Sequence, residues 1–309
     1  MGFIDRSNNI YVIDTNMHDF DHYCAAYIVE GKEIALIDTG LPCKLEMVRA
    51  GIKAHGFSVS DISHIFVTHT EHADHSGNVG PFLRESPNAR VYIHPAGSQI
   101  LTDPSGIASA TSKSESAAKI AEKFKGMEAV PVSRIQYLND GDVFDLGNGE
   151  KLKIIFAPGH QPGNIAILEE KNKGLFVGDL VGNCFPDANA HYPLNPPGSD
   201  SIATISSLRK LMDIGAEYIY MGHYGISKDA KTILSKAINI FQSQLEIGRK
   251  CLDKGRPEDI SGEVYKMILP ELEKLRSARG EAIYQYATRD HVGKQVSNFA
   301  DYCQARLKS

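Results

Sequence analysis

Strand-like runs that end in a histidine or an aspartate recur through the first 225 residues, and this feature constrains the fold most. The runs are EIALI, ISHIFVT, KLKIIFAPG, GLFVG and EYIYMG, and the polar residues that follow them are Asp38, His69, His160, Asp179 and His223. The strands of a rigid sheet hold their terminal residues in place, so α/β enzymes collect reactive groups at strand ends. The pattern therefore predicts an α/β protein whose strand ends carry potential ligands.

The second of these strands runs into a loop, residues 68–75, with the sequence THTEHADH. The overall histidine content predicts about 0.3 histidines in eight residues, whereas this loop contains three. Imidazole and carboxylate ligands mixed in this way suit Zn, Fe or Mn. Gly159 and Gly222 stand directly before His160 and His223, where glycine permits a sharp turn and a close backbone approach to a metal. The combination predicts a metal site.

Short β-branched runs alternate with helical stretches up to about residue 225, and the pattern changes after that point. Residues 104–127 are polar and are expected to form an inserted arm that is helical or mobile. Residues 228–309 show no strand pattern and are typical of three or four amphipathic helices, with breaks near 255–262 and at Gly280. The expected strands span residues 10–14, 25–30, 33–38, 62–68, 89–95, 151–157, 164–170, 174–179 and 217–222, with helices at 44–56 and 201–215.

Composition limits the partners that the chain is expected to have. Hydrophobic residues make up 42% and charged residues 23%, which is ordinary for a globular protein. The net charge is −5 and no Lys/Arg-rich run occurs, so we expect neither a nucleic-acid nor a membrane partner. The N-terminus has no basic region followed by an apolar one, and the five cysteines are widely scattered. These features predict a cytoplasmic protein.

Five segments together resemble the metallo-β-lactamase-fold superfamily over about residues 8–225. They are LIDTG, VTHTEHADHSGN, APGHQPGN, LFVGDLV and MGHYG, in the family's order and spacing. The resemblance implies an αββα sandwich, with two packed sheets, helices outside and a metal site at one edge. Residues 1–225 are expected to form the catalytic domain, and 226–309 a helical C-terminal extension packed near the active site. Such an extension is similar to those of glyoxalase-II-like and quinolone-signal thioesterase-like members, where it helps to form the substrate pocket.

The resemblance also implies two divalent metal ions, with zinc favoured and iron or manganese as the alternatives. The implied ligands of the first ion are His69, a second residue of the loop, and His160. Those of the second ion are Asp74, His75 and His223, and Asp179 would bridge the two.

One departure from the family pattern leaves the second loop ligand open. The family has His-x-His-x-Asp-His, whereas here the loop is one residue longer between His69 and Asp74. We favour His72 as the ligand because its spacing to Asp74 is intact. Glu71 is the alternative, because a His-x-Glu pair at this point resembles the flavodiiron branch, which uses iron. A further alternative is that the longer loop displaces His69 from the ligand set, and Glu71 would then hold a ligand in place or accept a proton.

The implied reaction is hydrolysis of a small ester, thioester or lactone by a metal-activated hydroxide. Asp74 would orient that hydroxide or take its proton, and Tyr224 or Tyr192 would stabilise the oxyanion. The segment 181–200 is expected to form a loop that contacts the substrate, with His191 and Cys184 as weaker candidates within it.

The alternative function is an iron-dependent oxidoreductase on the same fold, of the persulfide dioxygenase or diiron kind. The diiron branch normally adds a flavin domain, for which 309 residues with a helical tail are expected to leave no room. The apolar faces of the C-terminal helices are expected to pack against the sandwich, and a homodimer through these helices is the second interpretation.

Overall fold

A computed structural model of the chain describes residues 5–70, 73–105 and 124–307. Its first sheet is seven-stranded, in the order β1-β2-β3-β4-β5-β6-β7. Neighbours are antiparallel from β1 to β4 and parallel from β4 to β7. The strands are β1 (Arg6–Ser7), β2 (Ile10–Asp14), β3 (Ala25–Glu30), β4 (Ile34–Ile37), β5 (Ile62–Phe66), β6 (Arg90–Ile93) and β7 (Ile135–Tyr137).

The second sheet is six-stranded, in the order β15-β14-β11-β10-β9-β8, and only β11 and β14 pair in parallel. A separate hairpin, β12–β13, follows β11 along the chain. The strands are β8 (Val143–Gly147), β9 (Glu150–Phe156), β10 (Ile165–Glu169), β11 (Gly174–Gly178), β12 (Asn183–Phe185), β13 (Ala190–Tyr192), β14 (Tyr218–Met221) and β15 (Ile226–Ser227).

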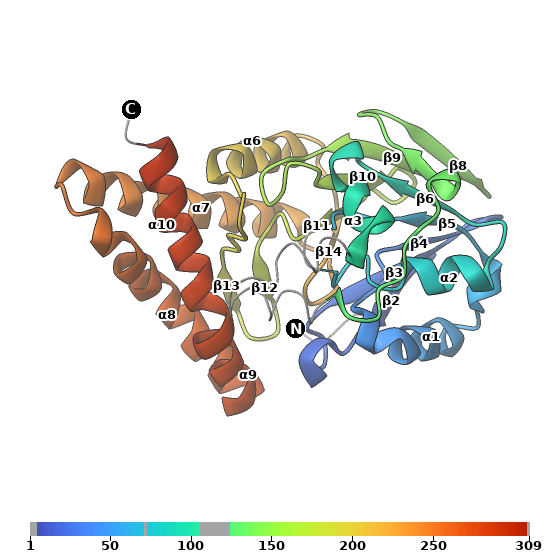
Figure 1. Cartoon of the computed structure of the whole chain (residues 1–309), viewed down its shortest axis with the longest axis horizontal. Helices are drawn as coiled ribbons and strands as arrows, with labels where there is room; N and C mark the ends of the chain where they lie inside the picture. The colour runs from blue at the N-terminus through green and yellow to red at the C-terminus, as the bar shows by residue number, and fades with distance from the viewer. Residues whose placement is uncertain (1–4, 71–72, 106–123, 308–309) are drawn as a thin grey trace.

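Helices cover the outer faces of both sheets, and those after residue 229 extend to one side of the sandwich (Figure 1). A π-helical turn, Ala287–Val292, joins α9 to α10. The helices are α1 (Leu45–Ala54), α2 (Val79–Glu85), α3 (Ser98–Thr102), α6 (Ser201–Met212), α7 (Ala230–Asp253), α8 (Ile260–Arg279), α9 (Glu281–Tyr286) and α10 (Gly293–Arg306).

Three apolar cores fill the spaces between these layers. Because side chains alternate between the two faces of a strand, each sheet contributes to a core on both of its faces. In β2, Ile10 and Val12 face the second sheet, whereas Tyr11 and Ile13 face α1 and α2. The inter-sheet core continues through β9 with residues such as Ile154. A third core joins the outer face of the second sheet to α6, α7, α8 and α10. Because both faces of each central strand are buried, the sheets form the inner layers of an αββα sandwich, as expected.

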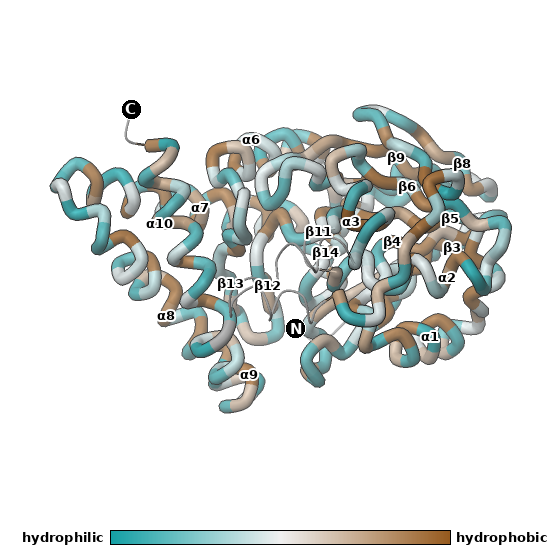
Figure 2. The backbone as a smooth tube through the Cα atoms, viewed as in Figure 1, coloured by the Kyte–Doolittle hydropathy of each residue, from teal (hydrophilic) through white to brown (hydrophobic). Residues whose placement is uncertain are grey.

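The C-terminal helices are amphipathic, and their apolar sides belong to this third core. Apolar and polar positions alternate along α8 and α10 in Figure 2. Helix α7 ends at Asp253 and α8 ends at Arg279, directly before Gly280, so the breaks lie where the sequence predicts them. Packing against the sandwich is what we observe, whereas the boundary at residue 225 and the homodimer stay predictions. Within the described ranges no helix is long and apolar enough to cross a bilayer.

Two sequence expectations differ from the structure. The segment 181–200, expected as a loop, contains the β12–β13 hairpin, whose three-residue strands are too short to show a period. Most of the expected arm at 104–127 lies outside the described residues. At its end, however, Phe124 and Met127 are buried in the core beneath the first sheet, so this part is not an exposed arm.

Candidate metal centre

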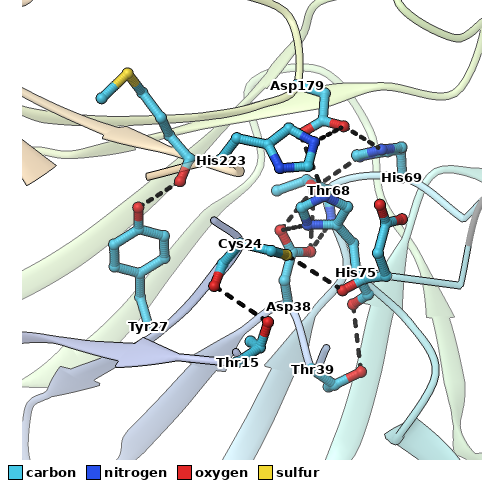
Figure 3. Close-up of polar contacts among 12 residues, drawn as sticks. Thr15, Cys24, Tyr27, Asp38, Thr39, Thr68, His69, His75, Asp179 and His223 are labelled. Atoms are coloured by element: carbon cyan, nitrogen blue, oxygen red, sulfur yellow. Dashed lines mark hydrogen bonds and ion pairs between the residues drawn. The ribbon is translucent and has the colours of Figure 1, made fainter. Parts of the chain in front are cut away.

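Asp179 stands directly after β11, and four imidazoles that follow other strands surround its carboxylate. Figure 3 shows three of them, those of His69, His75 and His223. All five side chains are almost fully buried. The Nε2 atoms of His75, His223, His69 and His160 lie 3.2, 3.3, 3.6 and 3.7 Å from the nearer oxygen of Asp179.

Together with Asp74, these side chains form two groups that could each hold a metal ion. Within each group the ligand atoms lie within 4.8 Å of one another, and Asp179 belongs to both. The groups are Asp74, His75, Asp179 and His223, and His69, His160 and Asp179. The structure therefore brings together the residues that the sequence assigns to two centres, apart from the second loop ligand.

Hydrogen bonds on the far side of the rings decide which nitrogen faces Asp179. His75 Nδ1 lies 2.9 Å from Asp38 Oδ2, and His223 Nδ1 lies 2.8 Å from the carbonyl oxygen of Tyr23. Both oxygens only accept, so each Nδ1 carries a proton, and in the neutral ring Nε2 is the nitrogen that keeps its lone pair. Metal-ligating histidines are held in this way in known proteins.

Asp38 is thus a partner of His75 and not a ligand, which corrects the interpretation of Asp38 as a potential ligand at a strand end. Its carboxylate also accepts hydrogen bonds from the Thr68 backbone N–H at 2.8 Å and from the Thr68 hydroxyl. Since this hydroxyl donates to Asp38, it accepts from His69 Nδ1, 3.0 Å away. One buried carboxylate therefore orients the rings of both His69 and His75.

The charges of the site favour a bound cation. Burial by itself would lower the pKa of His75, but the carboxylates of Asp179, Asp38 and Asp74 outweigh it and raise this pKa well above its usual value. Burial would likewise raise the pKa of Asp179, yet His223 and His75 hold it well below its usual range. Buried carboxylates thus require positive charge beside them, and a metal ion supplies it without protonating the rings. The donor set of nitrogen and carboxylate oxygen fits Zn, Fe or Mn.

Glycines before two of the histidines make room for this cluster. A Cβ at Gly159, whose φ is 145°, would lie 2.4 Å from the Thr204 backbone nitrogen. Gly222 is equally confined, by Asp179 and His75. Helix α6 therefore excludes a side chain at Gly159 and the ligand cluster excludes one at Gly222, whereas the expected approach of the backbone to a metal stays a prediction.

A small pocket of about 120 Å³ opens beside His69. Ile93 and Ile100 give it an apolar side, and Gln161 contributes an amide. Gln161 is 5% exposed, and its Nε2 has no hydrogen-bond partner among the described residues. Sequence reasoning did not select Gln161; its position directly after His160 is the signal that could have done so.

The remaining candidates lie elsewhere or outside the described residues. Glu71 and His72 belong to the undescribed part, so the second loop ligand stays a prediction. The Tyr224 ring is buried and lies 5.5 Å from the guanidinium of Arg279, and its catalytic role also stays a prediction. The ring that packs on His223 is that of Tyr23, 5.3 Å away between centroids, which the sequence did not single out.

Comparison with known proteins agrees with this geometry. The profile of the metallo-beta-lactamase superfamily matches residues 20–223. The chain belongs to the metallo-beta-lactamase superfamily. A metallo-beta-lactamase family protein from Thermus thermophilus has a similar structure, with a TM-score of 0.67 and 21% identity, covering 97% of this chain and 94% of the other.

Two relatives in sequence carry different names within this metallo-beta-lactamase superfamily. The acyl-coenzyme A thioesterase MBLAC2 of Homo sapiens is 27% identical over 233 residues, which cover 70% of this chain and 78% of that protein. The "Putative diflavin flavoprotein A 1" of Nostoc sp. is 29% identical over 164 residues, or 52% of this chain. The match spans only 24% of the Nostoc protein's length.

Proposed function

We propose that this protein is a metal-dependent hydrolase that holds two divalent ions and cleaves a small thioester, ester or lactone. The observation that carries the proposal is the sharing of Asp179 between two buried groups of ligands. Zinc is the metal we favour, because imidazole and carboxylate ligands in a buried site suit it. The similarity to a human acyl-coenzyme A thioesterase over most of that protein's length supports a thioester as the first substrate to test.

Asp74 and Asp38 have separate roles in the proposed reaction. When bound, a divalent metal would polarise a carbonyl and lower the pKa of its water to about 7. Asp74 belongs to the second group of ligands and is 4% exposed, a position from which a carboxylate orients the attacking water or accepts its proton. Asp38 keeps His75 in the tautomer whose Nε2 faces the site.

Gln161 is the residue that we assign to the substrate's carbonyl oxygen. Its buried amide nitrogen has no hydrogen-bond partner in the described part of the chain, and it lines the pocket that also contains His69. An amide N–H in a site that excludes water stabilises negative charge as it develops on oxygen. The pocket, at about 120 Å³, is smaller than a whole-ligand site of roughly 300 Å³ or more. It therefore suits the reacting acyl end of a substrate.

An iron-dependent oxidoreductase is the second candidate. The similarity to the Nostoc protein favours it, as does the glutamate in the lengthened loop. The two proposals differ in metal and in reaction, so one preparation can separate them.

The experiment combines metal analysis of the purified chain with anomalous scattering at the zinc and iron edges of a crystal. About two zinc ions per chain, with hydrolysis of an acyl-coenzyme A thioester or a lactone that is lost on chelation and restored by zinc, would support the hydrolase. Iron together with thiol-dependent oxygen uptake would support the oxidoreductase instead. Protein that takes up neither metal from a metal-rich medium would contradict both.

A further inference from the structure

A second cavity lies away from the metal centre, between the β12–β13 hairpin and helices α7 and α8. Its volume is about 530 Å³, within the roughly 300–1,000 Å³ of small-molecule sites. No member of the two metal-ligand groups lines it. In Figure 1 the hairpin stands between α8 and the strands β11 and β14. The cavity also reaches the edge of the second sheet, where Ser227 of β15 lines it.

His191 gives the cavity a buried hydrogen-bond acceptor. Its Nε2 lies 2.7 Å from the carbonyl oxygen of Val181, so Nε2 carries the proton and Nδ1 is bare. The side chain is 6% exposed, and Nδ1 has no hydrogen-bond partner among the described residues. Burial lowers the pKa of His191 to about 4, so the ring is neutral at pH 7. A buried acceptor without a partner is costly, and a ligand with a donor removes that cost.

The charged side chains that line the cavity are those of Asp229, Lys236, Glu271 and Lys274. Asp229 accepts the backbone N–H of Thr232 at the start of α7. Glu271 accepts the backbone N–H of His191 and pairs with Lys274. Lys236, on the exposed side of α7, has no ion pair within the described part of the chain. The formal charges of the lining sum to zero, and the ammonium group of Lys236 is the one that can face a ligand's anion, because Lys274 is held by Glu271.

The rest of the wall is largely apolar. Helix α7 contributes Ile233 and Ile240, and helix α8 contributes Met267 and Ile268. Side chains of this kind accept an aliphatic chain or a ring without requiring specific partners.

We propose that this cavity binds a small amphipathic carboxylate that also carries a hydroxyl or N–H donor. The carboxylate lies against the ammonium group of Lys236, and the donor hydrogen-bonds to His191 Nδ1. The apolar body of the ligand packs against the isoleucine and methionine side chains of α7 and α8.

The test is isothermal titration calorimetry of the full metal-loaded chain with matched ten-carbon probes. 3-Hydroxydecanoate and 10-hydroxydecanoate each carry a carboxylate and a hydroxyl donor, and the distance between the two groups differs between these probes. Decanoate lacks the hydroxyl donor, and 1,10-decanediol lacks the carboxylate. At least one hydroxy acid should bind with one ligand per chain and about fivefold more tightly than decanoate. This comparison of ligands needs no variant and so does not depend on the folding of one.

Lys236→Gln should weaken binding of that hydroxy acid about fivefold while leaving 1,10-decanediol unchanged. Lys231→Gln is the matched control, since Lys231 is exposed on the same helix and does not line the cavity. Equal affinities for decanoate and both hydroxy acids would overturn the role of His191. Binding that is unaffected by Lys236→Gln would place the acids elsewhere, the metal centre included, and would overturn the site. Absence of binding at millimolar probe would overturn it as well.

Discussion

Gly222 lies so close to Asp179 that a Cβ at position 222 would stand 2.3 Å from Asp179 Oδ1. The same Cβ would lie 2.7 Å from His75 Cε1. The backbone before His223 thus forms one wall of the candidate metal centre, and no side chain fits between that wall and the carboxylate that both ligand groups share.

Gly222→Ala should therefore displace Asp179 and lower the metal content of the protein. We expect loss of metal from both groups and destabilisation of about 1–3 kcal/mol, as in other overpacked sites. Gly262→Ala is the control, because a Cβ at Gly262 meets nothing within 4 Å. The readouts are metal per chain and the free energy of unfolding. A variant with full metal content would show that Asp179 can move without releasing the ions.

Asp38→Asn should weaken metal binding although Asp38 is not a ligand. An amide in place of the carboxylate can offer a donor to His75 Nδ1, which then favours the tautomer with the proton on Nε2. Loss of such an orienting partner typically weakens metal affinity about 10–100-fold. Glu33→Gln is a matched control, since Glu33 makes a similar bond of 2.6 Å to His64, outside the ligand groups. Competition with a chelator measures the affinity, and equal values for the two variants would contradict the role of Asp38.

The lengthened loop permits a direct comparison of its two candidate ligands. His72→Ala should lose the metal of the group that contains His69 and His160, together with activity, whereas Glu71→Gln should keep both. The reason is that the spacing from His72 to Asp74 matches the superfamily pattern. The reverse result, with metal lost only in Glu71→Gln, would make Glu71 the ligand and would favour the iron enzyme.

Gln161→Leu should reduce kcat/KM by about 10²–10³-fold, which is typical for removal of one donor to a developing oxyanion. The loss should appear mainly in kcat, and the metal content should not change. Gln136→Leu, at an exposed position of β7, controls for the substitution itself. If kcat holds while KM rises, Gln161 contributes to substrate binding only.

His191 should make the free energy of unfolding depend on pH in a defined window. Its pKa is about 4 in the fold because burial opposes the charged form, and Lys236 adds to this; the ordinary value is about 6.5. Above pH 6.5 the ring is neutral in both states and contributes no pH dependence. As pH falls from 6.5 to 4 the unfolded chain binds the proton first, so stability is lost, by about 3 kcal/mol in total.

His191→Gln should flatten this part of the curve, because the amide keeps an N–H for Val181 but does not titrate. Urea unfolding at several pH values between 4 and 7 gives the two slopes. Parallel curves for wild type and variant would show that His191 takes up its proton without unfolding.

The sequence by itself determined which residues stand at the ends of which strands. Residues 62–68 and 174–179 were expected to be strands, and they appear as β5 and β11, directly before the histidine-rich loop and Asp179. Period and turn signals are local, so they identify strands, helix breaks such as Gly280, and the residues that follow them. The order of the five motifs resembles that of the superfamily, and this resemblance predicts the αββα sandwich.

Only the tertiary structure decided how those residues meet. The bond from His223 to the Tyr23 carbonyl joins positions 200 residues apart, and the bond from His75 to Asp38 joins positions 37 apart. No local pattern encodes such pairs. The first arises when the two sheets pack, and the second when β4 and β5 pair within the first sheet and bring the segments that follow them together. For the same reason the sequence did not predict the β12–β13 hairpin that contains His191, or the cavity that this hairpin lines. The burial of the Gln161 amide is likewise a property of the folded chain. The sequence therefore identifies the candidate ligand residues. The packing of distant segments determines the tautomers of the histidines, their neighbours and the cavities that a substrate can enter.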